Sequence, residues 1–428
     1  MPPSFQRFPL ARIALLAFAS LSAAVAHGQV VIGAARMTPL PAVSDQPAST
    51  PKAGQPGSLA KIDSMFGKQG PLFRWGSLVV HSNTGYTFIR SDGLLRVPGQ
   101  PLNTTQHTLS EALDFDLGST WTLSTNFSYT TYSNKALVDT TDSSVSISGR
   151  WTVGEWRLAA AHQFAGNNPI VAETGGQNSE RTNSTTLSAT RDLFDRTQIQ
   201  LSANQSVHRA DSRFKNSLWT GSDWTGTGFS AALQYRATSR LTFSGSYGYG
   251  YDAISANPDI SHYSVRGNVG WKLGNKWSVA AGGGRDYRSV RETNGVKSET
   301  PIYDASLSYS PTVVTTFSLV ATRIISTAYF NDQTIVNQTW SANVSQRLLG
   351  IVFLTAGYTE GRSKYSANLR TVAFRRADQF DSSNVGLSTV FGQRGSISIG
   401  YRLSRNNSGD RLFRFDTHSL DANLGYRF

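Results

Sequence analysis

Segments of about ten residues, in which apolar and polar side chains alternate, recur from Trp75 onward. Within residues 120–132, for example, Trp121, Leu123 and Phe127 fall on one face of an extended strand, and Thr, Ser and Asn residues fall on the other. A two-faced segment of this length suits a tilted strand that crosses a bilayer, with its apolar face toward lipid and its polar face toward a lumen. We predict such strands over residues 78–90, 104–117, 120–132, 142–152, 155–165, 183–192, 196–208, 227–237, 240–252, 261–273, 276–287, 300–310, 313–325, 336–347, 350–362, 382–391, 395–405 and 416–428.

The connections between these segments alternate in length along the whole series. Short turns such as Gly118-Ser119 and Val153-Gly154 alternate with long loops such as 133–141 and 166–182. Outer-membrane barrels have short periplasmic turns and longer extracellular loops, whereas a soluble sandwich has no reason to keep this parity. The sequence therefore predicts an all-β fold, a transmembrane antiparallel up-and-down β-barrel of about 18 strands, within a range of 16–18.

The last predicted strand alternates apolar and polar residues and ends on Tyr426-Arg-Phe428. A strand with an open edge invites aggregation, so we expect this strand to pair with the first one, near 78–90, and to close the barrel. Tyr426 and Phe428 resemble the assembly signal of bacterial outer-membrane barrels. This resemblance implies the barrel-assembly machinery as a partner.

Residues 1–26 have the layout of a secretory signal peptide. Arg7 and Arg12 precede the apolar run 13–26, which ends in the small-x-small triplet Ala24-Val25-Ala26. The run is too short to span a bilayer comfortably as an anchor. We expect cleavage after Ala26 and export through the inner membrane.

Residues 27–76 separate this signal peptide from the barrel. Their content of Pro, Ala, Ser and Gly predicts a flexible periplasmic segment. Within 59–66, the spacing of Leu59, Ile62 and Phe66 predicts one short amphipathic helix, which would act either as a tether or as a plug in the lumen. The barrel domain then covers residues 77–428.

The composition limits the partners. The chain has no cysteine, which excludes disulfides and thiolate metal sites. Its net charge of +12 favours acidic partners, and we expect no nucleic acid, because the chain is exported and its basic residues are dispersed. We expect outer-membrane lipid and the phosphates of lipopolysaccharide as partners of the basic residues in the long loops, and capture of an acidic substrate is the alternative. These residues are Arg362, Lys364, Arg370, Arg375, Arg376, Arg405, Arg411 and Arg414.

The polar face of the predicted strands is rich in Ser, Thr, Gly, Asn and Gln, which leaves room for water or for sugar hydroxyls. Basic residues on that face gather near the periplasmic end and form a predicted pore-lining rim of Arg150, Arg157, Arg236, Lys272, Arg347 and Arg427. Rings of Arg and Lys favour anions in a pore. The alternative is local pairing with acidic residues on the same face, which are Asp114, Asp116 and Asp192.

An enzyme is the main rival class. Outer-membrane lipid hydrolases need a Ser–His pair on the lipid-facing side, where His162 is the candidate, whereas His208 phases toward the lumen and His262 lies at a strand start. No Ser–His–Asp arrangement and no metal-ligand spacing is evident among the seven histidines. We predict no enzyme, no catalytic residue, no metal site and no cofactor.

The barrel region also resembles a known family. Trp75-Gly-Ser-Leu-Val-Val-His-Ser82, Gly85-Tyr-Thr-Phe88, a loop with Pro98-Gly99, and Leu117-Gly-Ser-Thr-Trp-Thr-Leu-Ser-Thr-Asn-Phe-Ser-Tyr-Thr-Thr-Tyr132 resemble the β-barrel porins of the porin-2 type, as a loose pattern over residues 73–428. Some of these barrels are associated with exopolysaccharide export systems. The resemblance implies a Gram-negative outer-membrane channel for polysaccharide or another hydroxyl-rich or acidic solute, with export proteins as partners.

A general, mildly anion-selective diffusion porin is the alternative function, and a lipid hydrolase is the third. The sequence leaves open whether the barrel is a monomer or a trimer.

Overall fold

A computed structural model describes residues 72–97, 100–168, 170–171, 176–177, 179–211, 223–255, 258–291, 297–327, 333–367, 375–392 and 394–428. The expected signal peptide, the segment up to residue 71 and the expected helix near 59–66 lie outside the described residues.

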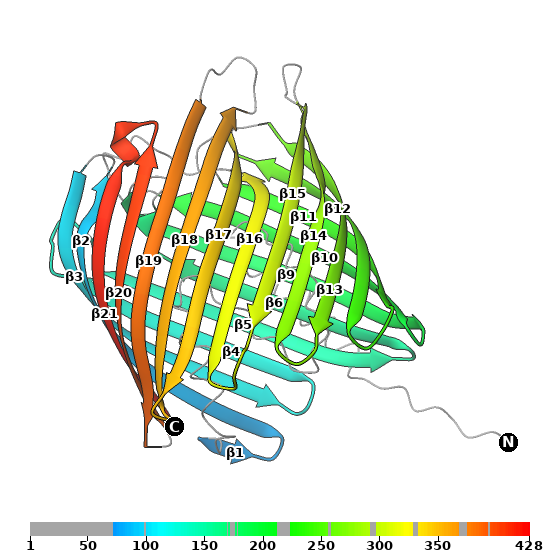
Figure 1. The fold of residues 1–428 in the computed structure, drawn as a ribbon, viewed down its shortest axis with the longest axis horizontal. Coiled ribbons are helices and arrows are strands. Elements are labelled where there is room, and N and C mark those ends of the chain that lie inside the picture. The colour runs from blue at the N-terminus through cyan, green and yellow to red at the C-terminus, as the bar shows by residue number, and fades with distance from the viewer. Residues whose placement is uncertain are drawn as a thin grey trace.

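Eighteen antiparallel strands form a closed barrel, in which each strand is hydrogen-bonded to its neighbours in chain order (Figure 1). The predicted fold class is therefore confirmed. The barrel strands are β2 (Leu78–Val97), β3 (Gln100–Leu117), β4 (Trp121–Tyr132), β5 (Thr140–Val153), β6 (Trp156–Asn167), β9 (Ser179–Phe194), β10 (Thr197–Asp211), β11 (Trp224–Arg236), β12 (Leu241–Ile254), β13 (Ile260–Leu273), β14 (Trp277–Val290), β15 (Lys297–Tyr309), β16 (Thr315–Thr327), β17 (Gln333–Leu348), β18 (Val352–Ala367), β19 (Arg375–Phe391), β20 (Gly395–Ser408) and β21 (Phe415–Arg427).

The short connections gather at one end of the barrel, which we call the turn end, and the long ones at the other, the loop end (Figure 1). Several strands run further toward the loop end than the sequence predicts; β19, for example, begins at Arg375 rather than at residue 382. Backbone hydrogen bonds between the strands continue beyond the part of the wall that needs an apolar outer face. The alternation of apolar and polar residues that marks a strand in the sequence is therefore lost before the strand ends.

Closure joins β2 to β21, as predicted. Asn83 lies opposite Arg427, and the register continues to Asp92 opposite His418. The Thr87 hydroxyl donates to Asn423 Oδ1 across this seam at 2.8 Å.

Four short elements complete the described structure: β1 (Phe73–Trp75), β7 (Ile170–Val171), β8 (Gly176–Gln177) and the 3₁₀ turn η1 (Arg411–Phe413). β1 pairs with the first residues of β2, where β21 no longer reaches, so β1 and β21 lie end to end along one edge of β2. β8, in the connection between β6 and β9, contacts β2. In the part of the chain described here, no helix has the length and apolar character needed to cross a membrane.

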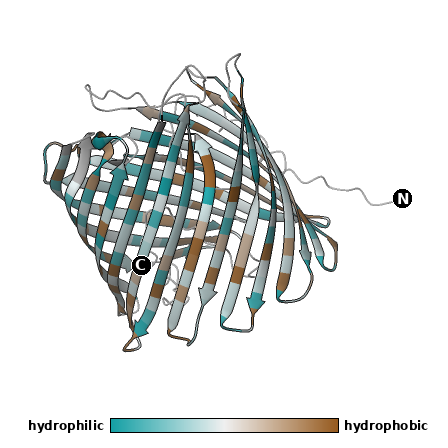
Figure 2. Cartoon of the chain, turned by 45° about the horizontal axis from the view of Figure 1, so that its top comes forward, coloured by the Kyte–Doolittle hydropathy of each residue, from teal (hydrophilic) through white to brown (hydrophobic). Residues whose placement is uncertain are grey.

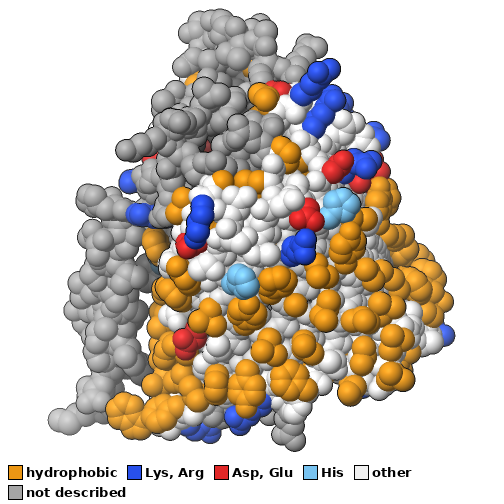
Figure 3. Space-filling view, turned by 90° about the vertical axis from the view of Figure 1, so that its left-hand side faces the viewer, with side chains coloured by type: hydrophobic (Ala, Val, Ile, Leu, Met, Phe, Trp, Pro, Cys, Tyr) orange, Lys and Arg blue, Asp and Glu red, His pale blue; other side chains and the backbone are white. Residues whose placement is uncertain are grey.

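The outer face of the barrel is apolar toward the turn end. Hydrophobic and hydrophilic residues alternate along the strands (Figure 2), and the apolar set is exposed on the outside, with Phe243, Tyr249, Val265 and Ile399 among the exposed side chains. Figure 3 shows hydrophobic side chains as a belt over the lower part of the face in view. Aromatic rings stack across strands near both borders of the belt, as in Trp277–Tyr309, with centroids 3.8 Å apart, and Tyr263–Tyr287, at 4.7 Å.

The clusters of buried apolar side chains in the described structure are small and lie on the inner face near the loop end. Ile254, Ile260 and Val290 form the largest, with Trp224 packed against it. The wall is therefore held mainly by its ladder hydrogen bonds rather than by a central core, which leaves the inner face at the turn end to polar side chains.

Candidate functional site

The inner face of the wall is a surface of small hydroxyl side chains. Residues directly opposite each other on neighbouring strands share a face, and the inward-facing pairs hydrogen-bond to one another. Examples are Ser202–Ser230 at 2.7 Å, Ser382–Ser404 at 2.9 Å and Thr108–Thr130 at 2.8 Å. These hydrogen bonds hold the short polar side chains of the inner face in place.

The six basic residues predicted as a rim all share the parity of this polar face and lie near the turn end. Their directly opposed partners include Ala159 for Arg150, Thr190 for Arg157, Thr242 for Arg236, Ser278 for Lys272, Phe353 for Arg347 and Asn83 for Arg427. The register thus places them on β5, β6, β11, β13, β17 and β21.

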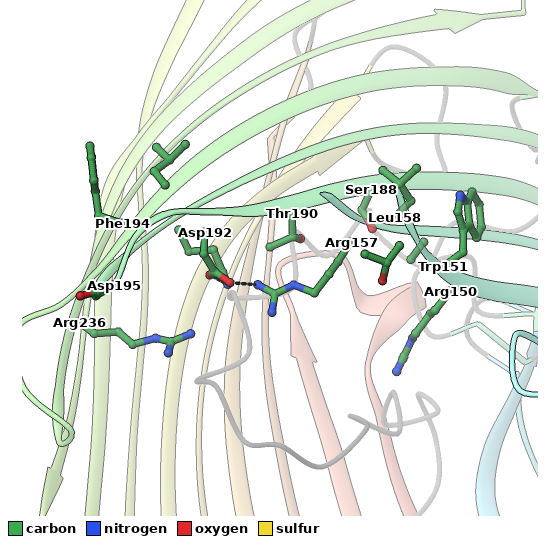
Figure 4. A pocket seen from close by; sticks show the side chains of 14 residues that line it. Arg150, Trp151, Arg157, Leu158, Ser188, Thr190, Asp192, Phe194, Asp195 and Arg236 are labelled. Atoms are coloured by element: carbon green, nitrogen blue, oxygen red, sulfur yellow. Dashed lines mark hydrogen bonds and ion pairs between the residues drawn. The ribbon is translucent and has the colours of Figure 1, made fainter. Parts of the chain in front are cut away.

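Three of the six converge on one cavity of about 980 Å³ at the turn end, lined by β5, β6, β9, β10 and β11. In Figure 4 the side chains of Arg150, Arg157 and Arg236 extend into the same space, while the rings of Trp151 and Phe194 point away from it. Its polar lining otherwise consists of Thr152, Ser188, Thr190, Asp192, Asp195 and Gln198.

Asp192 holds one of these arginines in place. Arg157 Nη2 donates to Asp192 Oδ2 at 2.9 Å, and the Gln198 amide donates to the other carboxylate oxygen, also at 2.9 Å. Both charged side chains are exposed, so the pair contributes at most about 1 kcal/mol to stability. No ion pair of the described residues involves Arg150 or Arg236. The cavity therefore keeps an excess of positive charge.

The other three basic residues lie elsewhere around the wall. Arg347 Nε donates to the Gly350 carbonyl in the adjoining turn, and its guanidinium lies 6.0 Å from the centroid of the Phe353 ring. Lys272 is exposed on β13 and Arg427 lies on β21. The predicted set is therefore divided between one cavity and three separate positions.

Local pairing, the alternative reading of the rim, is present in part. Besides Asp192, Asp116 accepts a hydrogen bond from Thr122 at 3.0 Å, and one of its oxygens lies 3.8 Å from His81 Nε2. Asp114 lies opposite His81 and Ser124. Among the described residues, neither Asp114 nor Asp116 forms an ion pair with a member of the basic set.

Sequence reasoning missed a group of inward-facing ion pairs nearer the loop end. They are Arg266–Asp304, Arg288–Asp286 and Arg376–Asp378. Arg376 corrects an expectation, because its side chain is 1% exposed and bound to Asp378, so it faces the barrel interior and not lipopolysaccharide. The signal was available in the spacing, because two residues that lie two positions apart on one strand, such as Arg376 and Asp378, share a face.

Two of the histidines singled out by the sequence, His162 and His208, lie on opposite faces of the wall. His162 faces outward, as predicted, and its Nδ1 is hydrogen-bonded to the Thr185 hydroxyl at 2.9 Å. His208 is buried on the inner face, 1% exposed. Within the described residues, no group of three His, Cys, Asp or Glu side chains is placed to hold a metal ion.

No protein-family model and no curated protein matches the chain. Among solved structures, OpdL of Pseudomonas aeruginosa is similar with a TM-score of 0.48 at 14% identity, over 83% of this chain and 99% of that one. A BenF-like porin from Pseudomonas fluorescens Pf-5 gives 0.49 at 11% identity, over 82% and 99%. Pseudomonas aeruginosa OprD gives 0.45 at 10% identity, over 82% and 95%. The closed barrel itself is established by the strand register.

Proposed function

We propose that the protein is a passive channel of a Gram-negative outer membrane with a preference for small anionic solutes. An apolar outer belt suits lipid, and a closed wall leaves no strand edge unsatisfied inside a bilayer. In this orientation the turn end faces the periplasm and the loop end faces outward.

The observation that carries the anion preference is the convergence of Arg150, Arg157 and Arg236 on one cavity. Its lining holds two carboxylates, Asp192, which is paired with Arg157, and Asp195, so the arginines are in excess. Guanidinium groups keep their charge at any physiological pH and bind carboxylate or phosphate oxygens with two parallel hydrogen bonds. A solute anion that reaches this part of the lumen would find donors already directed into the open space. Lys272, Arg347 and Arg427 extend the same rim around the wall in this proposal.

Planar-bilayer recordings of the full-length protein in a KCl gradient test this function. We expect a steady open conductance with a reversal potential on the anion-selective side. In the triple variant Arg150→Gln, Arg157→Gln, Arg236→Gln, the chloride-to-potassium permeability ratio should fall toward unity, because the fixed positive charge at the mouth is removed.

The matched control is Lys135→Gln, Lys297→Gln, Lys364→Gln, which removes three exposed charges at the loop end. This control should keep most of the selectivity. A channel that is cation-selective in the unsubstituted protein, or whose selectivity follows the loop-end charges instead, contradicts the assignment to the cavity.

Polysaccharide export is the second candidate, and it rests on the hydroxyl-lined wall, since Ser and Thr hydrogen-bond to sugar hydroxyls as well as to water. A hydroxyl-lined wall suits the passage of a small hydrated solute as well as that of a polysaccharide, so passive diffusion is our main proposal. A barrel that stays silent at full length and conducts only when residues 27–71 are removed would favour gated export and reverse this order.

A further inference from the structure

Leu349 occupies an unfavourable position in the turn between β17 and β18. It is the one described residue other than glycine with a positive φ, 47°, and Gly350 follows with φ 79°. Asn or Gly adopts this backbone with little strain, whereas a bulky side chain does not. The Leu349 side chain is also 93% exposed. Leucine is unfavourable in this backbone conformation, and its apolar side chain is unfavourable in water. Such a residue is a candidate for a contact with a molecule outside the chain.

Other tips at the turn end share this exposure of apolar side chains. Single exposed apolar residues are ordinary on a protein surface, but here they recur at turns around the circumference of the barrel. They are Trp75 at 76%, Val153 at 58%, Phe194 at 75% and Val313 at 103%.

Basic side chains lie in four turns of the same end, one of which, between β9 and β10, also carries Phe194. Arg196, Arg240, Lys276 and Arg394 are exposed, and none of the ion pairs among the described residues involves them. Of the acidic residues in these turns, Glu155 is paired with Arg191, which leaves Asp195. Figure 3 shows Lys and Arg side chains at the bottom edge of that face, directly below the apolar belt.

We propose that these residues form a turn ring that binds the anionic phospholipid surface of the inner leaflet. The turn ring consists of Trp75, Val153, Phe194, Val313 and Leu349 with Arg196, Arg240, Lys276 and Arg394. The apolar tips enter the boundary between headgroups and acyl chains, and the four basic side chains contact the phosphates. The inference rests on the proposed function, because it requires the barrel to lie in a bilayer with its turn end at that leaflet.

A lipid leaflet fits the arrangement better than a protein partner does. The apolar tips are distributed over turns between β1 and β2, β5 and β6, β9 and β10, β15 and β16, and β17 and β18, rather than gathered in one patch. A leaflet meets a barrel on all sides, whereas a protein interface is a contiguous surface. Apolar and aromatic side chains combined with Lys and Arg are the usual composition of interfacial anchors.

Single-cysteine probes test the apolar half of the ring, and the chain has no cysteine to interfere. Leu349→Cys and Val313→Cys, with Lys135→Cys at the loop end as the matched control, are labelled with an environment-sensitive fluorophore in phosphatidylcholine bilayers. We expect blue-shifted emission and several-fold weaker iodide quenching for the two ring probes than for the control. Equal quenching at all three sites overturns the proposal.

Anionic lipid tests the basic half. In neutral detergent micelles, added phosphatidylglycerol should raise the heat-unfolding midpoint of the full-length protein more than added phosphatidylcholine does. This difference should vanish in Arg196→Gln, Arg240→Gln, Lys276→Gln, Arg394→Gln, and persist in the loop-end control Lys135→Gln, Lys297→Gln, Lys364→Gln, Arg411→Gln. Equal effects of the two lipids on the unsubstituted protein overturn the charge assignment.

Two further outcomes separate the possible failures. Probes that are quenched freely in pure phospholipid but protected in native outer-membrane fragments would assign the ring to a protein partner and overturn the lipid proposal. A protein that neither inserts nor conducts defeats the proposed function itself, whereas a conducting barrel with freely quenched ring probes defeats this inference alone.

Discussion

Arg376 lies at the centre of a group of contacts on the inner face near the loop end. Its guanidinium lies between two aromatic rings, 4.8 Å from the centroid of Tyr365 and 3.5 Å from that of Phe413. Nε and Nη2 donate to the two oxygens of Asp378 at 2.9 and 2.6 Å, and the Ser408 hydroxyl donates to the same carboxylate at 2.6 Å. The Arg376–Asp378 pair thus links β18, β19, β20 and η1.

Asp378→Asn should destabilise the barrel by about 3 kcal/mol or more, because it leaves the Arg376 charge buried without its partner. The measurement is urea unfolding in lipid, followed by tryptophan fluorescence. The double variant Arg376→Met, Asp378→Leu removes both charges and should cost much less. If the single and double variants unfold alike, the cost of Asp378→Asn does not come from an unpaired charge.

At the scale of strands, two glycines on β14 make room for an ion pair between its neighbours. Arg266 on β13 lies opposite Gly284, and Asp304 on β15 lies opposite Gly282, so the Arg266–Asp304 pair passes over β14. A Cβ added at Gly284 would overlap the backbone carbonyl of Val265, and one at Gly282 would overlap the Asn268 side chain. The absence of side chains on β14 therefore lets β13 and β15 be linked directly.

Gly284→Ala should destabilise the protein by about 1–3 kcal/mol through overpacking against backbone. Gly283→Ala is the matched control, because Gly283 has the opposite parity and the nearest atom, the Ile302 carbonyl oxygen, lies 3.9 Å from an added Cβ. The control should unfold at nearly the unsubstituted urea concentration. Equal losses from both substitutions would mean that strand propensity, and not crowding over β14, sets the cost.

The same elements show how far a sequence determines this structure. Strand number and order were predictable because the bilayer imposes an apolar face on each strand, so the alternation in residues such as Trp121 and Leu123 reports the environment directly. The inward parity of Arg150, Arg157 and Arg236 follows from the same period of two. The convergence of these arginines on one cavity does not follow from this period. It depends on strand tilt and stagger, which neighbouring residues do not encode. β1 and the pair Arg376–Asp378 were missed for a related reason: both lie where the wall leaves the apolar belt and the alternation ends.

For the whole molecule, closure of the wall depends on contacts between residues far apart in the chain. Thr87 and Asn423, which are hydrogen-bonded across the seam, are separated by 336 positions. Every other barrel strand pairs with a neighbour that is adjacent in chain order.

The pair Thr87→Cys, Asn423→Cys should form a disulfide under mild oxidation, because directly opposed residues of a ladder bring their Cβ atoms to about 4.5–5.5 Å. Gel electrophoresis of the unfolded chain reports the result, since a ring closed over most of the chain migrates differently from a linear one. Thr87→Cys, Ser318→Cys, which joins β2 to the non-adjacent strand β16, should stay reduced. A bond in the control, or none in the seam pair, is incompatible with this closure.

The seam between β2 and β21 constrains how the barrel can fold and insert into a membrane. In hydrocarbon every backbone donor and acceptor needs a partner, and an arc of strands short of the full circle presents two edges without one. Because β2 finds β21 only when the last strand is present, no shorter arc of this chain is free of that cost. In the proposed membrane setting, insertion should therefore be cooperative, with the edges of the growing arc kept out of the hydrocarbon until the circle is complete.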